Sequence, residues 1–115
     1  MNWKDINQAE QLPLIEQESH KTPCLIFKHS TRCSISSIAK FRLEKEWTFS
    51  EMEMVPYYLD LIEHRHLSNA VAEKFEVHHE SPQIILLWKG EVLLDASHLD
   101  ISVLEIKEVI DFQRN

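Results

Sequence analysis

Cys33 is the residue best suited to carry chemistry in this chain, because it follows a polar loop and opens a predicted helix. The first amides of a helix have no partner inside it, and the aligned peptide dipoles make that end partly positive. Cysteines at such positions have thiol pKa values between roughly 3.5 and 7.5 instead of 8.5. Arg32, Lys28 and His29 add positive charge nearby. We therefore expect a reactive thiolate, the alternative being the inert, buried role of many free cysteines.

The spacing Cys33-Ser34-Ile35-Ser36 is the redox motif C-x-x-C with serine in place of the second cysteine. In a dithiol site, the second cysteine resolves the mixed disulfide by attacking it within the molecule. A hydroxyl does not exchange with disulfides, because the exchange requires a thiolate. The spacing therefore predicts a monothiol site that an outside thiol must resolve.

A short strand and a helix must hold this cysteine between them. Residues 25–27 form an apolar run typical of a buried strand, and residues 29–31 interrupt it with turn-forming and capping side chains. From Ile35 onward the apolar residues recur at helical spacing. This pattern predicts a helix that ends near Glu46 and buries Ile35, Ile38, Ala39 and Leu43.

The rest of the chain alternates strands with helices. Before the cysteine we expect an edge strand over residues 3–6 and a helix over 7–19 that Asn7 caps. After it we expect a strand over 55–62 and a helix over 67–75 that Ser68 or Asn69 caps. A hairpin over 83–95 and a final helix from residue 100 or 102 onward complete the chain. The final helix has a broad apolar face, made of Val103, Leu104, Ile106, Val109, Ile110 and Phe112. This order predicts an α/β fold with a mixed sheet of four to five strands, helices on both faces and one domain over residues 1–115.

Composition and charge narrow the function classes. The chain has 115 residues and a net charge of −7, which disfavours nonspecific binding to nucleic acid or an anionic membrane. The only glycine is Gly90, which excludes glycine-rich phosphate loops, and the apolar run 84–88 is too short to span a bilayer. With no signal region at the N-terminus we expect a cytoplasmic protein, whose thiols stay reduced. Cys24 lies about 13 Å below the strand end, so we expect a core residue and no bridge to Cys33.

Seven histidines raise the question of a metal site. His64 and His66, and the pair His78-His79, are close in sequence, but they lack the spacing of zinc ligands on one element, so we expect no metal. His29 could relay a proton to Cys33 or cap local backbone. The roles of His29 and His98 stay open at this point.

Two further stretches carry a family resemblance. Residues 58–61 resemble the third strand of the thioredoxin fold, and residues 71–77 with 81–91 resemble its helix, cis-proline loop and last hairpin. Residues 27–36 are similar to the monothiol bacilliredoxins, the YtxJ-like family, whose single cysteine follows lysine, histidine, serine and threonine. This chain departs from the family in having Ser34 where proline is common. The resemblance implies a thioredoxin-like three-layer sandwich.

The resemblance also implies an activity, which is removal of the small thiol bacillithiol from S-thiolated client proteins, with bacillithiol as co-substrate and no tightly bound cofactor. Cys33 would attack the mixed disulfide, with the thiol and client bound by Lys28, Thr31, Arg32, Ser34, Ser36, Ser81 and Pro82. In this scheme Thr31 and Ser36 hydrogen-bond near the sulfur, and Lys28 and Arg32 attract the carboxylates of the small thiol. A cis Pro82 would leave the backbone of Ser81 free to pair with a client strand.

Two alternatives remain open from the sequence. One is a noncatalytic thioredoxin-like binding or stress module, with Cys33 kept for packing. The other is a glutathione-dependent monothiol glutaredoxin, against which residues 95–98 read Asp-Ala-Ser-His where such enzymes have a glycine pair.

Overall fold

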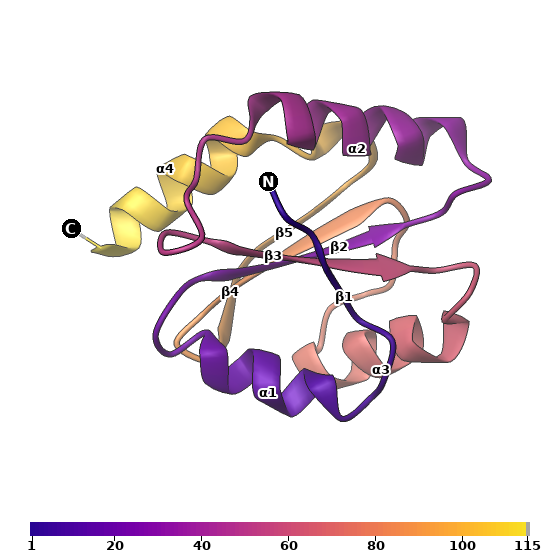
Figure 1. Ribbon diagram of the computed structural model, residues 1–115, viewed down its shortest axis with the longest axis horizontal. Coiled ribbons are helices and arrows are strands. Elements are labelled where there is room, and N and C mark those ends of the chain that lie inside the picture. The colour runs from indigo at the N-terminus through magenta and orange to yellow at the C-terminus, as the bar shows by residue number, and fades with distance from the viewer. Residues whose placement is uncertain (115) are drawn as a thin grey trace.

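Five strands form one mixed sheet in the computed structural model, which describes residues 1–114. Their spatial order is β1-β3-β2-β4-β5 (Figure 1). The strands are β1 (Lys4–Asp5), β2 (Cys24–His29), β3 (Val55–Asp60), β4 (Gln83–Trp88) and β5 (Glu91–Ser97). Strands β1, β3 and β2 are parallel, whereas β4 runs antiparallel to β2 and to β5.

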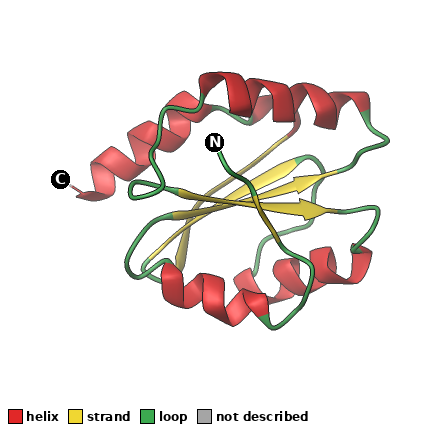
Figure 2. Cartoon of the chain, viewed as in Figure 1, coloured by secondary structure: helices red, strands yellow, loops and turns green. Residues whose placement is uncertain are grey.

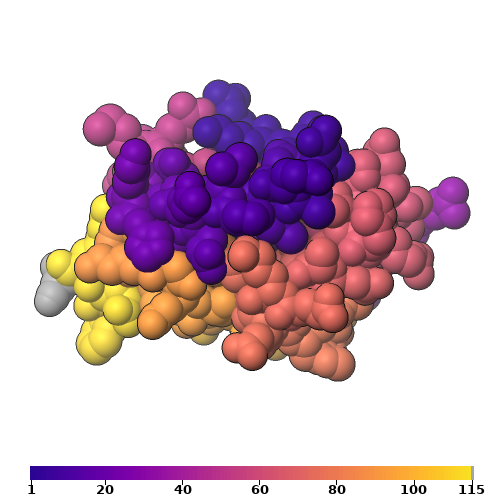
Figure 3. All heavy atoms as spheres, turned by 90° about the horizontal axis from the view of Figure 1, so that it is seen from below, coloured from indigo at the N-terminus to yellow at the C-terminus, as the bar shows by residue number. Residues whose placement is uncertain are grey.

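Helices cover both faces of this sheet (Figure 2). On one side lie α2 (Ser34–Glu46) and α4 (Val103–Arg114), and on the other lie α1 (Gln11–Glu18) and α3 (Arg65–Phe75). Figure 3 views the molecule from the α1–α3 side, where both helices lie at the surface. A short 3-10 turn, η1 (His98–Asp100), joins β5 to α4. The predicted α/β sandwich of thioredoxin type, with a mixed sheet and helices on both faces, is confirmed.

Strand β2 lies at the centre of the sheet, and all six of its residues are buried. Its side chains alternate between the two layers, because successive residues of a strand point to opposite faces. Leu25 and Phe27 join the core beneath α2 and α4, whereas Cys24 and Ile26 join the core beneath α1 and α3. Cys24 is thus a core residue, as expected, and burial raises the pKa of its thiol to about 12.

Three helix starts differ from the predictions. Helix α1 begins at Gln11 rather than Asn7, because the Gln11 side chain accepts hydrogen bonds from the amides of Asn7 and Gln8 at 2.7 and 2.9 Å and holds them in a turn. Helix α3 begins before Ser68, which is buried inside the helix and is not a cap. Helix α4 begins at Val103, one residue after the later of its two predicted starts, and the Ser102 hydroxyl accepts a hydrogen bond from the Glu105 amide at 3.2 Å.

Two predicted apolar faces are partly wrong. In α2, Ile35 and Ile38 are 44% and 50% exposed, because the helix turns Ser36, Ala39 and Leu43 toward the sheet. In α4, Leu104 and Phe112 point outward while Val103, Ile106 and Ile110 are buried. No helix among the described residues is long and apolar enough to cross a membrane.

Candidate thiol site

Cys33 is the N-cap residue of α2, with extended backbone angles of φ −113° and ψ 123°. Its amide donates to the Ser30 carbonyl and its carbonyl accepts from the Ser37 amide, both at 3.1 Å, so the backbone is fixed on both sides. The residue is partly exposed and its thiol is free. The predicted order of strand, polar loop and cysteine at the helix start is therefore correct, and the position is open to solvent.

The neighbours of Cys33 divide into exposed and buried residues. Thr31, Arg32 and Ser34 are exposed beside it. Ser36 is fully buried one helical turn later. The structure thus places three of the predicted binding residues where a small thiol can reach them, and their roles stay a prediction.

Ser36 holds the loop that carries the cysteine. Its Oγ accepts a hydrogen bond from the Ser30 amide at 3.0 Å and shares another with Nδ1 of His29 at 2.7 Å, whose donor depends on the imidazole tautomer. The hydroxyl therefore links the end of β2, the loop and the first turn of α2. The Ser36 hydroxyl thus contacts His29 and Ser30, and the expectation that it hydrogen-bonds near the sulfur stays a prediction.

His29 is buried between two aromatic rings, stacked on Phe27 and tilted against Tyr58. Its centroid lies 5.6 Å from that of Phe27 and 5.7 Å from that of Tyr58. Burial, with a smaller contribution from Lys40, lowers the pKa of His29 below its ordinary value. A neutral imidazole at neutral pH can accept from or donate to Ser36. Nδ1 of His29 therefore contacts the Ser36 side chain rather than local backbone, and a proton relay to Cys33 stays a prediction.

Replacing Ser36 with alanine is expected to lower the free energy of unfolding by about 1–3 kcal/mol, because the Ser30 amide and His29 Nδ1 then lose a partner inside the protein. The neighbouring Ser37 is exposed and its alanine variant serves as the control, expected within about 0.5 kcal/mol of the parent. Urea denaturation measures both. Equal stability of the two variants would show that Ser36 does not hold the loop.

The position of Lys28 does not fit its predicted role in binding the small thiol. Its side chain is fully buried on the α3 side of β2, with Nζ 3.1 Å from the Ser68 carbonyl oxygen and 3.2 Å from Nδ1 of His79. Burial lowers the pKa of Lys28 to about 8. An enclosed ammonium cannot meet the carboxylates of a ligand in solvent. The prediction that Lys28 attracts the small thiol is therefore replaced by an internal role.

The lowered pKa of Lys28 predicts a stability that rises with pH. The unfolded chain keeps this proton up to about pH 10.5, whereas the folded protein releases it near pH 8, so the unfolded state binds more protons between these values. The parent should gain about 2 kcal/mol relative to Lys28→Met between pH 7 and 9.5. Cys24 and Tyr57, whose pKa values burial raises to about 12, oppose this trend equally in both proteins. Parallel pH profiles in urea denaturation would contradict the prediction.

The loop before β4 lies at the same edge of the sheet as Cys33. Its Ser81–Pro82 bond is cis, as the resemblance implied. Gln83 follows and pairs with Lys28 in the sheet, so this loop meets the carboxyl end of β2, toward which the arrowheads of β2 and β3 point in Figure 1. Pro82 is buried and its carbonyl accepts from the His98 amide at 3.0 Å. Residues 30–33 and 81–82 therefore border one surface.

Two side chains of this loop region bear on binding. Ser81 is partly exposed, and its Oγ is buried with no hydrogen-bond partner among residues 1–114. His98 lies against the loop, with Nε2 3.8 Å from Oε2 of Glu80. The role of His98 stays open, and the nearby carboxylate of Glu80 makes that position less suited to an anion.

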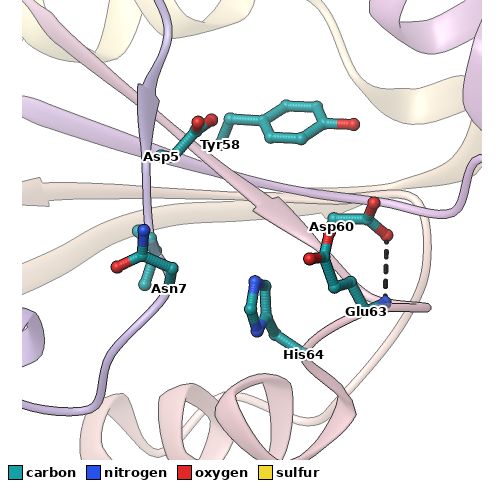
Figure 4. Close-up of a pocket in the computed structure, with 7 residues that line it drawn as sticks. Asp5, Asn7, Tyr58, Asp60, Glu63 and His64 are labelled. Atoms are coloured by element: carbon teal, nitrogen blue, oxygen red, sulfur yellow. Dashed lines mark hydrogen bonds between the residues drawn. The ribbon is translucent and has the colours of Figure 1, made fainter.

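A polar hollow of about 340 Å³ lies at the ends of β1 and β3 (Figure 4). It is lined by Asp5, Ile6, Asn7, Tyr58, Asp60, Glu63 and His64. The Asp60 carboxylate is occupied in part by the amides of Ile62 and Glu63, at 3.0 and 3.3 Å. Three carboxylates disfavour an anionic ligand here, so the acid groups of a small thiol would fit better beside Arg32.

In residues 1–114, no group of histidine, cysteine and acidic side chains is arranged to hold a metal ion.

Sequence reasoning missed the partners of Lys28. The sequence pattern indicates no role for His79, yet its Nδ1 meets both Lys28 Nζ and, at 3.1 Å, the Ser68 hydroxyl. A signal for this was present, because a lysine inside a strand that is apolar on both faces must find a polar partner. The identity of that partner depends on tertiary packing.

Comparison with known proteins agrees with this geometry. The family described as "Monothiol bacilliredoxin BrxC" matches residues 4–106. A solved protein described as a candidate oxidoreductase with a thioredoxin fold is 30% identical, covers 92% of this chain and 91% of its own, and superposes with a TM-score of 0.78.

Solved thioredoxins are more distant in sequence. Those of Trypanosoma brucei brucei and Malassezia sympodialis are both 14% identical, with TM-scores of 0.73 and 0.70, and each match covers 99% of this chain. The match covers 93% of the Trypanosoma chain and 92% of the Malassezia chain, and both establish the fold. Family and fold together support thiol redox chemistry, and over residues 4–106 the chain belongs to the monothiol bacilliredoxin family.

Proposed function

We propose that this protein is a monothiol disulfide reductase that removes a low-molecular-weight thiol, bacillithiol, from protein mixed disulfides through Cys33. The observation that carries the proposal is a partly exposed cysteine at the N-cap of α2, with a buried serine at the position of a resolving cysteine. Cys24, the other cysteine, is buried in the core and cannot take part without unfolding.

The reaction consists of two thiol–disulfide exchanges. The Cys33 thiolate attacks the bacillithiol sulfur of the mixed disulfide, a new S–S bond forms, and the client cysteine leaves as a thiolate that takes a proton from water. A second bacillithiol, as thiolate, then attacks the bacillithiol sulfur on Cys33. The bacillithiol disulfide departs and the Cys33 thiolate is restored. In sum, one mixed disulfide and one free bacillithiol become the reduced client thiol and bacillithiol disulfide, so one disulfide bond is broken and one is formed.

The exposed side chains beside Cys33 supply binding. Arg32 offers a cation to the carboxylates of the small thiol, and Thr31 and Ser34 offer hydroxyls to its polar groups. Ser81 borders the same surface and offers backbone groups to an extended client segment. The scheme needs a reducing compartment such as the cytoplasm, where the small thiol is kept reduced.

Mass spectrometry tests the proposal directly. The protein is mixed with a peptide that carries bacillithiol on its single cysteine, and in parallel with the same peptide carrying glutathione. We expect the free peptide to appear together with a bacillithiol adduct on Cys33 and none on Cys24. If the peptide stays modified, the function is wrong; if only glutathione is removed, bacillithiol is the wrong co-substrate.

A further inference from the structure

Lys28 is a buried charge whose contacts join three separate parts of the fold. Its Nζ lies on the α3 side of β2 and touches the Ser68 carbonyl oxygen of α3 and Nδ1 of His79 in the loop 76–82. Enclosing an ammonium is strongly unfavourable unless hydrogen bonds replace those it makes with water. Of its contacts, the one with His79 crosses to the loop that ends in Pro82.

The same loop has a second attachment one strand away. Gln83 pairs with Lys28 in the sheet, and its side-chain Nε2 donates to the His78 carbonyl at 2.9 Å while its Oε1 accepts from the Glu80 amide at 3.4 Å. Lys28 thus holds the His79 side chain and Gln83 holds the backbone on either side of it. Lys28 and Gln83 thus fix residues 78–80. The next residue, Ser81, lies at the edge of the sheet that carries Cys33.

We propose that Lys28 is a positioning residue, which acts through His79 to hold the loop 76–82 so that Ser81 can receive the client segment of a mixed disulfide. The inference rests on the proposed function for its substrate. Lys28 itself touches neither substrate nor sulfur. Its loss should therefore weaken the use of a peptide disulfide while leaving the reaction of Cys33 with a small alkylating agent unchanged.

Three variants test this. Lys28→Met keeps the apolar stem and removes the donor, His79→Leu removes the acceptor, and Lys21→Met changes an exposed lysine in the turn before β2 as the control. Each of the first two variants removes a hydrogen bond that involves the charged ammonium, so each should lower kcat/KM for the thiolated peptide by about tenfold or more, mainly through KM. All three should react with iodoacetamide at Cys33 within about twofold of the parent.

A double variant and an exchange measurement separate positioning from mere stability. If Lys28 acts through His79, Lys28→Met/His79→Leu should lose no more activity than either single variant. Amide hydrogen exchange over residues 77–83 should be faster in both single variants, at a temperature where circular dichroism shows them folded, and unchanged in Lys21→Met. Should Lys28→Met not fold, His79→Leu carries the same comparison.

The inference is overturned by unchanged exchange in the loop, by losses that multiply in the double variant, or by a fall in kcat/KM no larger than the unfolded fraction explains. Failure of the proposed function gives a different result. In that case the parent itself does not release the peptide, and the exchange measurement still decides whether Lys28 holds the loop.

Discussion

Replacing Cys33 with serine is expected to lower kcat/KM for a thiolated peptide by about 10³-fold or more, to the background rate of the small thiol alone. The nucleophile in thiol–disulfide exchange is a thiolate, and a serine hydroxyl does not attack disulfides. The fold should be unharmed. Serine is a preferred N-cap residue, whereas Cys33 makes no side-chain capping hydrogen bond, so the variant should be as stable as the parent or about 0.5–1 kcal/mol more stable.

Cys24→Ala is the matched control for this loss. Its sulfur is buried and 3.3 Å from the Thr22 carbonyl oxygen, so its removal should cost about 1 kcal/mol of stability and leave the reaction rate unchanged. Release of peptide from the mixed disulfide and urea denaturation measure the two effects. The assignment of the nucleophile fails if Cys33→Ser keeps the activity, or if Cys24→Ala is the variant that loses it.

The sequence was sufficient to place the cysteine, because the signals around it are local. An apolar run bounded by polar turn residues indicates a buried strand, and a change to helical spacing after Cys33 indicates where a helix begins. The alternation of strands with helices then determines that the ends of β2 and β3 meet at one edge. The cis bond before Pro82 followed from the family resemblance rather than from spacing.

The directions of side chains at the site could not be read from the same signals. In α2, the apolar residues are so scattered that two different faces fit the helical period, and the buried face contains Ser36 rather than Ile35. Its hydroxyl is buried because His29 and the Ser30 amide provide partners, and His29 belongs to another element. Lys28 was misplaced for a related reason, since a charged residue near a site suggests a ligand until both sheet faces are known to be covered.

The contacts under the cysteine form one connected set on the α2 side of β2. Phe27 stacks on His29, His29 shares a hydrogen bond with Ser36, and Ser36 holds the Ser30 amide in the loop before Cys33. Core packing and the position of the sulfur are therefore linked through neighbouring residues. A change in Phe27 should act on both, with the larger effect on stability.

Phe27→Ala is accordingly expected to lower the free energy of unfolding by about 3–5 kcal/mol, a large part of the 5–15 kcal/mol typical of a domain. The ring is fully buried and stacks on Trp3 and His29, with centroids 5.5 and 5.6 Å apart, so its removal leaves a cavity that these rings cannot fill without moving. Urea denaturation measures the change. Where the variant is still folded, weaker support of His29 should also expose the Ser30 amide to faster hydrogen exchange.

Phe41→Ala removes the same ring from a site where burial contributes little, because Phe41 is 63% exposed on α2. Its stability should stay within about 0.5 kcal/mol of the parent, and exchange at Ser30 should not change. The comparison separates burial from residue type, since both variants lose an identical side chain. Similar losses in the two variants would mean that Phe27 is not packed as described, and that the support beneath His29 and the cysteine loop has another source.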